Sequence, residues 1–110
     1  MNILIIGQCT LHWGRMEFGN IGNYYIIEPF MRELHKVFPN SSIKTTMQMS
    51  ERFCKDERVS VVPMELYYSW KENELELAKN ELDIALHYND TGELLETTPF
   101  IDEVMKADLV

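Results

Sequence analysis

The chain has 110 residues and a mass of 13.0 kDa, enough for one domain, and 45% of its residues are hydrophobic. This composition argues against a disordered chain, which has fewer apolar residues, and against a membrane span, which needs a long uncharged run. Acidic residues outnumber basic ones by 18 to 10, and the resulting net charge of −8 argues against partners such as nucleic acid or an anionic membrane surface.

The first half of the chain predicts two strands separated by a helix. Residues 3–6 form a short apolar, β-branched run that ends at Gly7, as in a strand buried on both faces. After a polar loop, apolar residues recur at helical spacing over 27–38, with Asn23 as the expected N-cap. Pro29 requires either a kink or a regular helix that starts near residue 28. Residues 43–47 then alternate as in a second strand.

The second half continues the alternation of strands and helices. One or two helical turns are expected at 50–55, followed by a third strand at 59–62 that Pro63 ends. Residues 69–72 spell a capping box for a helix whose apolar face carries Leu75, Ala78, Leu82 and Ala85. The glutamates of this region are expected to face water: Glu72, Glu74, Glu76 and Glu81. Residues 89–92 predict a turn.

The last part of the chain predicts one more helix and the beginning of a strand. Thr98-Pro99 is a good N-cap and first-turn pair for a helix through about residue 106, and Leu109-Val110 begins a fourth strand. This order predicts an α/β fold with a parallel sheet of about four strands and right-handed crossovers. We expect residues 3–6 at the centre, flanked by the second and third strands. We also expect residues 1–110 to be one domain of a longer, truncated protein.

The loop from Gln8 to Asn23 is the predicted ligand-binding segment. It leaves the carboxyl end of the first strand and leads into a helix N-terminus, where free N–H groups and the helix dipole favour an anion. It is neither a dinucleotide fingerprint, because G-x-G-x-x-G is absent, nor a P-loop, because Gly-Lys-Ser/Thr is absent. The residues assigned to substrate binding are Gly7, His12, Arg15, Gly19, Asn20, Gly22 and Asn23.

No catalytic residue, metal site or cofactor is predicted from the sequence. His12 alone is more often a surface histidine than a catalyst, and Cys9 has no evident base that would make it a nucleophile. Cys9 and Cys54 are far apart and have no metal-ligand spacing, so reduced thiols are expected. The segment 1–7 lacks the basic residues and the longer apolar run of a signal peptide, and we expect a cytoplasmic protein.

Two segments resemble landmarks of the polysaccharide pyruvyl transferase family. The strand at 2–7 followed by Gly19-Asn20-Ile21-Gly22-Asn23 and an apolar helix resembles the start of these proteins, in which the loop reads G-N-x-G-D. The tail Ala107-Asp108-Leu109-Val110 resembles the family's A-D-x-V strand. Asn23 stands where the family has Asp. Asparagine caps a helix as well as aspartate does, but it cannot supply a negative charge.

The resemblance implies an architecture like that of two-domain glycosyltransferases, with two facing Rossmann-like, three-layer halves of which this chain would be the N-terminal one. It implies transfer of the enolpyruvyl group of phosphoenolpyruvate to a pair of saccharide hydroxyls as a ketal, with loss of phosphate. This chemistry needs a general acid, a base and a cationic cradle. Arg15 is the single basic residue in the loop, so the isolated chain is expected to be inactive.

Two other functions fit the same residues. The chain could be a small Rossmann-like module that binds a metabolite or partner without catalysis, or the N-terminal half of a glycosyltransferase that uses a nucleotide sugar. A reading frame that continues for about 200 residues beyond Val110 would exclude the first alternative. A cut end would also expose apolar side chains near residues 98–110, so we expect a homodimer through this C-terminal end.

Overall fold

A computed structural model describes residues 1–7, 21–47, 49–62 and 73–110. The chain divides into two compact units. Unit 1 comprises Met1–Val62 and Lys106–Val110, and unit 2 comprises Pro63–Met105. The described elements form a mixed α/β protein with a three-stranded parallel sheet and four helices.

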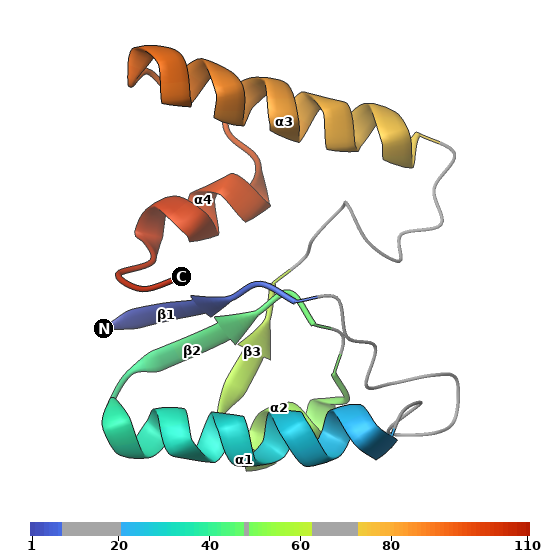
Figure 1. Cartoon of the computed structure of the whole chain (residues 1–110), viewed down its shortest axis with the longest axis vertical. Coiled ribbons are helices and arrows are strands. Elements are labelled where there is room, and N and C mark those ends of the chain that lie inside the picture. The colour runs from blue at the N-terminus through green and yellow to red at the C-terminus, as the bar shows by residue number, and fades with distance from the viewer. Residues whose placement is uncertain (8–20, 48, 63–72) are drawn as a thin grey trace. The chain divides into compact units, whose positions relative to one another are not determined.

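Unit 1 contains the parallel sheet, with β1 (Asn2–Ile5), β2 (Ser42–Thr45) and β3 (Val59–Val61) (Figure 1). The three strands expected from the sequence are therefore confirmed to within one or two residues at each end. The register places Ile3 beside Ile43 and Ile43 beside Val59, so one row of β-branched side chains crosses the sheet. Ile3 and its neighbour Leu4 are both buried, which confirms that β1 is covered on both faces.

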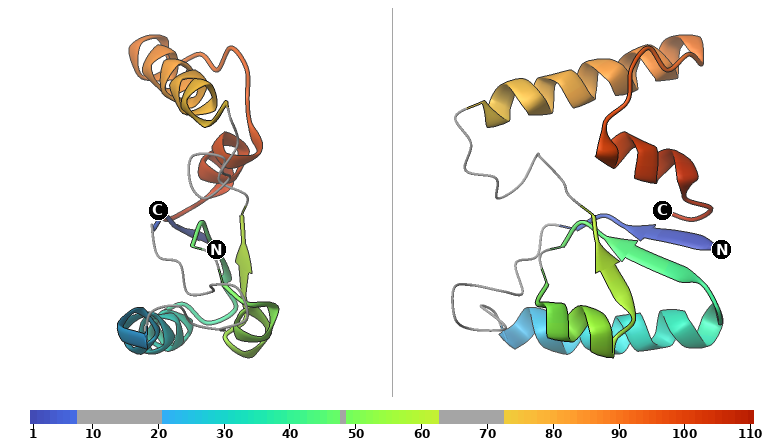
Figure 2. Two further views of the ribbon diagram at one scale, coloured as in Figure 1. Left: turned by 90° about the vertical axis from the view of Figure 1, so that its right-hand side faces the viewer. Right: turned by 180° about the vertical axis from the view of Figure 1, so that it is seen from behind.

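The strand order differs from the expected one. The order is β1-β2-β3, so β2 and not β1 is the central strand of the three. Each of the two crossovers adds the next strand on the same side of the preceding one, so β3 lies beside β2 and is not adjacent to β1. Right-handed crossovers that step in one direction also place their helices on one face of the sheet. Figure 2 shows α1 (Ile21–Val37) and α2 (Glu51–Asp56) on that common face.

The C-terminal residues pair with β1 on the edge that β2 leaves open. Leu109 forms an isolated parallel bridge with Ile3, and its carbonyl accepts a hydrogen bond of 2.9 Å from the Leu4 N–H. The Asp108 N–H donates to the Asn2 carbonyl at 2.8 Å, and the Asp108 carboxylate accepts from the Asn2 N–H at 2.7 Å. The tail thus begins a strand in the expected direction, although it is a single bridge and not a full fourth strand.

Helix α1 (Ile21–Val37) follows the loop after β1. It begins at Ile21, so Asn23 lies inside its first turn and the predicted N-cap is wrong. It runs through Pro29, so of the two expectations for this proline the regular helix that starts near residue 28 is wrong. Ile27 and Met31 are buried in the core on either side of Pro29, whereas the proline itself is exposed. Water can therefore reach the backbone carbonyl that the missing proline N–H leaves unpaired.

The core of unit 1 lies between the sheet and these two helices. Met31 has no exposed surface, and Phe53 of α2 (Glu51–Asp56) is 4% exposed. The other members of the buried cluster come from the strands and from α1: Ile3, Ile27, Ile43, Met47 and Val59. Helix α2 begins as expected, with the Ser50 hydroxyl accepting a hydrogen bond of 3.1 Å from the Phe53 N–H.

Unit 2 contains α3 (Glu74–Thr91) and α4 (Pro99–Lys106), whose last residue belongs to unit 1. The start of α4 is confirmed, because the Thr98 hydroxyl accepts a hydrogen bond from the Ile101 N–H at 3.2 Å. The turn expected at 89–92 is wrong. Helix α3 continues to Thr91 and ends on Gly92, whose φ of +73° is the left-handed conformation that glycine adopts without strain. The predicted capping box at 69–72 lies outside the described residues.

The exposure pattern of α3 also departs from the expected face. Leu75 and Leu82 are 83% and 56% exposed, whereas Ile84 is buried. Glu81, which was expected to face water, is only 8% exposed. The packing within unit 2 therefore buries a face of α3 that contains Glu81 and Ile84 and leaves Leu75 and Leu82 of the predicted face largely exposed.

Candidate functional site

One side-chain hydroxyl group links the segments that follow β1 and β2 at the carboxyl edge of the sheet. Gly7 follows β1 and Thr46 follows β2, and Thr46 is 3% exposed. The Gly7 N–H donates to the Thr46 hydroxyl at 3.0 Å, and the same hydroxyl donates to the Gly7 carbonyl at 3.1 Å. Both backbone groups of Gly7 are therefore satisfied by a side chain on the adjacent strand, which fixes the point where the predicted ligand loop begins.

Gly7 also lacks room for a side chain. A Cβ atom at this position would lie 2.8 Å from Cγ and 2.9 Å from Sδ of Met47, and Met47 is itself buried. These separations are shorter than any ordinary carbon contact. The glycine that the sequence analysis assigned to substrate binding is thus required by packing against the core.

The first turn of α1 holds two more of the assigned residues, Gly22 and Asn23. The helix begins at the edge where β1 and β2 end, and it runs back antiparallel to them (Figure 1). This first turn carries no acidic side chain of its own that would oppose the positive end of the helix dipole. Gly22 is helical, and Gly92 is the single glycine with positive φ among the described residues.

The middle of the predicted site lies outside the described residues. His12, Arg15, Gly19 and Asn20 all belong to the segment 8–20, as does Cys9. The structure therefore places the two ends of the loop, at Gly7 and at Gly22-Asn23, on one edge of unit 1. The contribution of the four residues between them stays a prediction.

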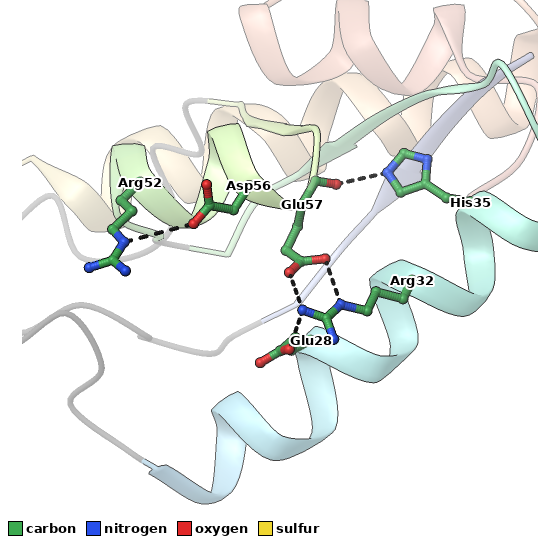
Figure 3. Close-up of polar contacts among 6 residues, drawn as sticks. All are labelled: Glu28, Arg32, His35, Arg52, Asp56 and Glu57. Carbon is green, nitrogen blue, oxygen red and sulfur yellow. Dashed lines mark hydrogen bonds and ion pairs between the residues drawn. The ribbon is translucent and has the colours of Figure 1, made fainter.

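A second polar cluster lies on the outer side of unit 1, where α1 meets α2 and the turn before β3 (Figure 3). The Arg32 guanidinium donates two hydrogen bonds to the Glu57 carboxylate, at 3.3 and 3.1 Å, and also pairs with Glu28 one turn earlier. The hydrogen bonding of the guanidinium to Glu57 is the main reason that the pKa of Arg32 is raised. Glu57 is 8% exposed, so this forked ion pair is the partner that its buried carboxylate needs.

His35 adds a further link between the same elements. Its Nε2 lies 2.8 Å from the Glu57 carbonyl oxygen. Because a carbonyl can only accept, Nε2 carries the proton and donates. Arg52 pairs with Asp56 within α2, with 3.8 Å between the nearest nitrogen and oxygen (Figure 3).

The groove over this cluster has a volume of about 640 Å³, and several of its charged lining groups already have partners. Arg32 is committed to two carboxylates and His35 to a backbone carbonyl, so we assign this cluster to holding α1 against the turn before β3. This cluster was not predicted from the sequence. The spacing of Glu28 and Arg32 was a visible signal of a helical ion pair, whereas the contact with Glu57, which lies 25 residues from Arg32, carried none.

Two further properties of the described residues bear on function. They contain no group of three or more His, Cys, Asp or Glu side chains that could hold a metal ion, and no helix among them is long and apolar enough to cross a membrane. Cys54 is a free thiol, partly buried against the core, and this burial raises its pKa. A raised pKa disfavours the thiolate and hence a nucleophilic role.

Comparison with known proteins gives no relative. No family model, no curated protein and no solved structure matches the chain.

Proposed function

We propose that this chain is the N-terminal, Rossmann-like part of a polysaccharide pyruvyl transferase-like enzyme and forms one wall of its phosphoenolpyruvate cleft. The observation that carries the proposal is the parallel pairing of Leu109 with Ile3. The sequence has two segments that resemble this family, the glycine-containing start of α1 and the tail at 107–110. Both lie next to β1, one following it in the chain and the other hydrogen bonded to it.

The carboxyl edge of unit 1 suits an anionic substrate. Gly7 and the first turn of α1 lie at this edge, the helix dipole offers partial positive charge there, and the first turn itself carries no acidic side chain. Phosphoenolpyruvate carries a phosphate and a carboxylate, both of which this environment favours. Transfer of the enolpyruvyl group also needs several cationic side chains around the phosphate and the carboxylate, and Arg15 is the single Lys or Arg of the loop. We therefore place the remaining cations of the cleft on a part of the enzyme beyond this chain.

An NMR titration of the 110-residue chain tests the proposal. Phosphoenolpyruvate at up to the order of 10 mM, where weak complexes are populated, should shift the amide signals of Gly7, Gly22 and Asn23. Binding should be weak, with a dissociation constant well above about 1 µM, which corresponds to roughly −8 kcal/mol. Pyruvate, which lacks the phosphate, should give smaller shifts at the same concentration.

A matched pair of variants separates this site from general charge effects. Tyr25→Asp adds a negative charge at an exposed position near the start of α1 and should reduce the shifts, because it repels the anion. Asn80→Asp also adds one negative charge, on an exposed position of α3, and should leave the shifts unaltered.

Three outcomes would count against the proposal. Absence of shifts at the carboxyl edge would remove the anion site. Larger shifts with a uridine diphosphate sugar than with phosphoenolpyruvate would favour a nucleotide-sugar glycosyltransferase. Shifts confined to the Arg32 and Arg52 amides would assign the anion to the groove between α1 and α2 instead.

A further inference from the structure

Unit 2 carries an apolar groove that the proposed function does not use. It has a volume of about 390 Å³ and lies between α3 and α4. Its walls are formed by aliphatic and aromatic side chains of both helices, among them Ala78, Ile84, Ala85, Phe100 and Val104. This volume falls within the range of ordinary binding pockets, and the lining is almost wholly hydrocarbon.

One lining residue does not fit this apolar environment. Glu81 is 8% exposed, and its Oε2 is buried without a hydrogen-bond partner among the described residues. Burying a carboxyl oxygen without a donor costs free energy, which a cation or another donor placed in the groove would offset. The groove therefore lacks a positively charged or hydrogen-bond-donating group at Glu81.

The exposed apolar surface extends beyond the groove itself. Leu82, Tyr88 and Met105 line it and are 56%, 40% and 50% exposed, and Leu86 and Leu95 nearby in the chain are 51% and 70% exposed. Large exposed apolar side chains gathered on two helices are typical of a surface that receives another protein segment. A small amine would fill the groove but would leave this surrounding surface in water.

The charge of unit 2 limits which segment can dock. From residue 73 to residue 105 the single lysine is Lys79, against nine acidic residues, namely Glu74, Glu76, Glu81, Asp83, Asp90, Glu93, Glu96, Asp102 and Glu103. This stretch thus accounts for a charge of −8, equal to the net charge of the whole chain. A second copy of the same surface would meet like charge, whereas a basic segment would be attracted.

We propose that the groove between α3 and α4 binds an amphipathic helix of a basic partner protein, with a lysine or arginine on the apolar face of that helix paired with Glu81. Leucine-like side chains spaced three and four residues apart would fill the groove on either side of the cation. Basic residues on the rim of the partner helix would face the acidic surface of α3. The proposal concerns unit 2 alone and stands independently of the phosphoenolpyruvate site.

The test uses the full chain and three synthetic helical peptides of about five turns. All three share an apolar stripe of leucines and a lysine-rich polar face, and they differ at one central position of the stripe, which is lysine, norleucine or glutamate. Fluorescence anisotropy measures their affinities. The lysine peptide should bind, and the norleucine and glutamate peptides should bind about tenfold more weakly or worse, because Glu81 then lacks its partner.

Matched protein variants assign the effect to Glu81. Glu81→Gln and Asp83→Asn each remove one negative charge from α3, but Asp83 is exposed and does not line the groove. Glu81→Gln should reduce affinity for the lysine peptide about tenfold and abolish its advantage over the norleucine peptide, whereas Asp83→Asn should change affinity less than about twofold. Circular dichroism checks that both variants fold.

Three results would overturn the proposal. If none of the peptides binds the folded chain, the groove does not receive such a helix. If the two variants weaken binding equally, the attraction comes from net charge and not from the buried carboxyl group. If the chain self-associates through α3 and α4, so that Leu82→Lys restores a monomer, the occupant is a second copy.

Discussion

Replacement of Gly7 by alanine should destabilise unit 1 through a single steric contact. The added Cβ would lie 2.8 Å from Met47 Cγ, whereas an ordinary contact begins near 3.4 Å, so the methionine must move by about 0.6 Å. Met47 is 3% exposed and belongs to the buried cluster, which leaves it little free space. Overpacking of this kind costs about 1–3 kcal/mol, partly offset by about 0.4–1 kcal/mol because alanine restricts the unfolded chain.

A double-mutant cycle with Met47→Ala isolates that contact. Met47→Ala alone should cost about 2–5 kcal/mol, because it leaves a cavity. Gly7→Ala added to it should then cost little, because the atoms that it would strike are gone. Urea denaturation followed by circular dichroism gives the four free energies of unfolding. A coupling energy of about 1–3 kcal/mol is expected.

Additive free energies, within about 0.5 kcal/mol, would refute the steric argument. Gly92→Ala is the control, because a Cβ there has nothing within 4 Å and the strain comes from its φ of +73°. It should cost about 1 kcal/mol and show no coupling to Met47→Ala. If the double variant Gly7→Ala/Met47→Ala also retains the amide shifts caused by phosphoenolpyruvate, the glycine serves packing and not the approach of a ligand.

Two substitutions, one reaction rate and one mass measurement test further parts of the structure. Thr46→Val removes a buried hydroxyl that satisfies two backbone groups and should lower the free energy of unfolding by about 1–3 kcal/mol in the same urea assay, whereas an unchanged midpoint would mean that water replaces it. Ser50→Ala removes the cap of α2 and should cost about 1 kcal/mol, and a neutral result would make that hydrogen bond unimportant. In a Cys9→Ser background, Cys54 should react with iodoacetamide more slowly than a free thiol at pH 8, because its raised pKa leaves less thiolate. The reaction rate should increase as the pH rises. Equal rates in native and unfolded protein would contradict this prediction. Light scattering decides between two expectations: the homodimer predicted from the sequence would give a mass that rises with concentration, whereas a groove left free for a basic partner would give a mass fixed at 13.0 kDa.

The local elements of this protein could be predicted from its sequence. The apolar β-branched run at the start predicted β1, Thr98-Pro99 predicted the first residue of α4, and Ser50 marked the start of α2. These signals are local, because a buried strand, an N-cap and a proline in a first turn each depend on a few neighbouring residues. The sequence also predicted correctly that the tail at Leu109 runs parallel to β1, because this segment was interpreted as a strand of the same parallel sheet.

The tertiary structure decided which elements meet and which side chains are buried. The sequence could not rank β2 above β1 as the central strand, because strand order depends on the direction in which each crossover steps. The sequence predicted that Glu81 faces water. An acidic residue next to leucines can lie at either edge of the apolar face of a helix, and the packing of a neighbouring helix decides which edge is buried. Nothing in the sequence indicated that the space for a side chain at Gly7 is occupied by Met47, which lies 40 positions along the chain. Contacts of this range leave no pattern in a single sequence, because they depend on packing between segments that are remote in the chain.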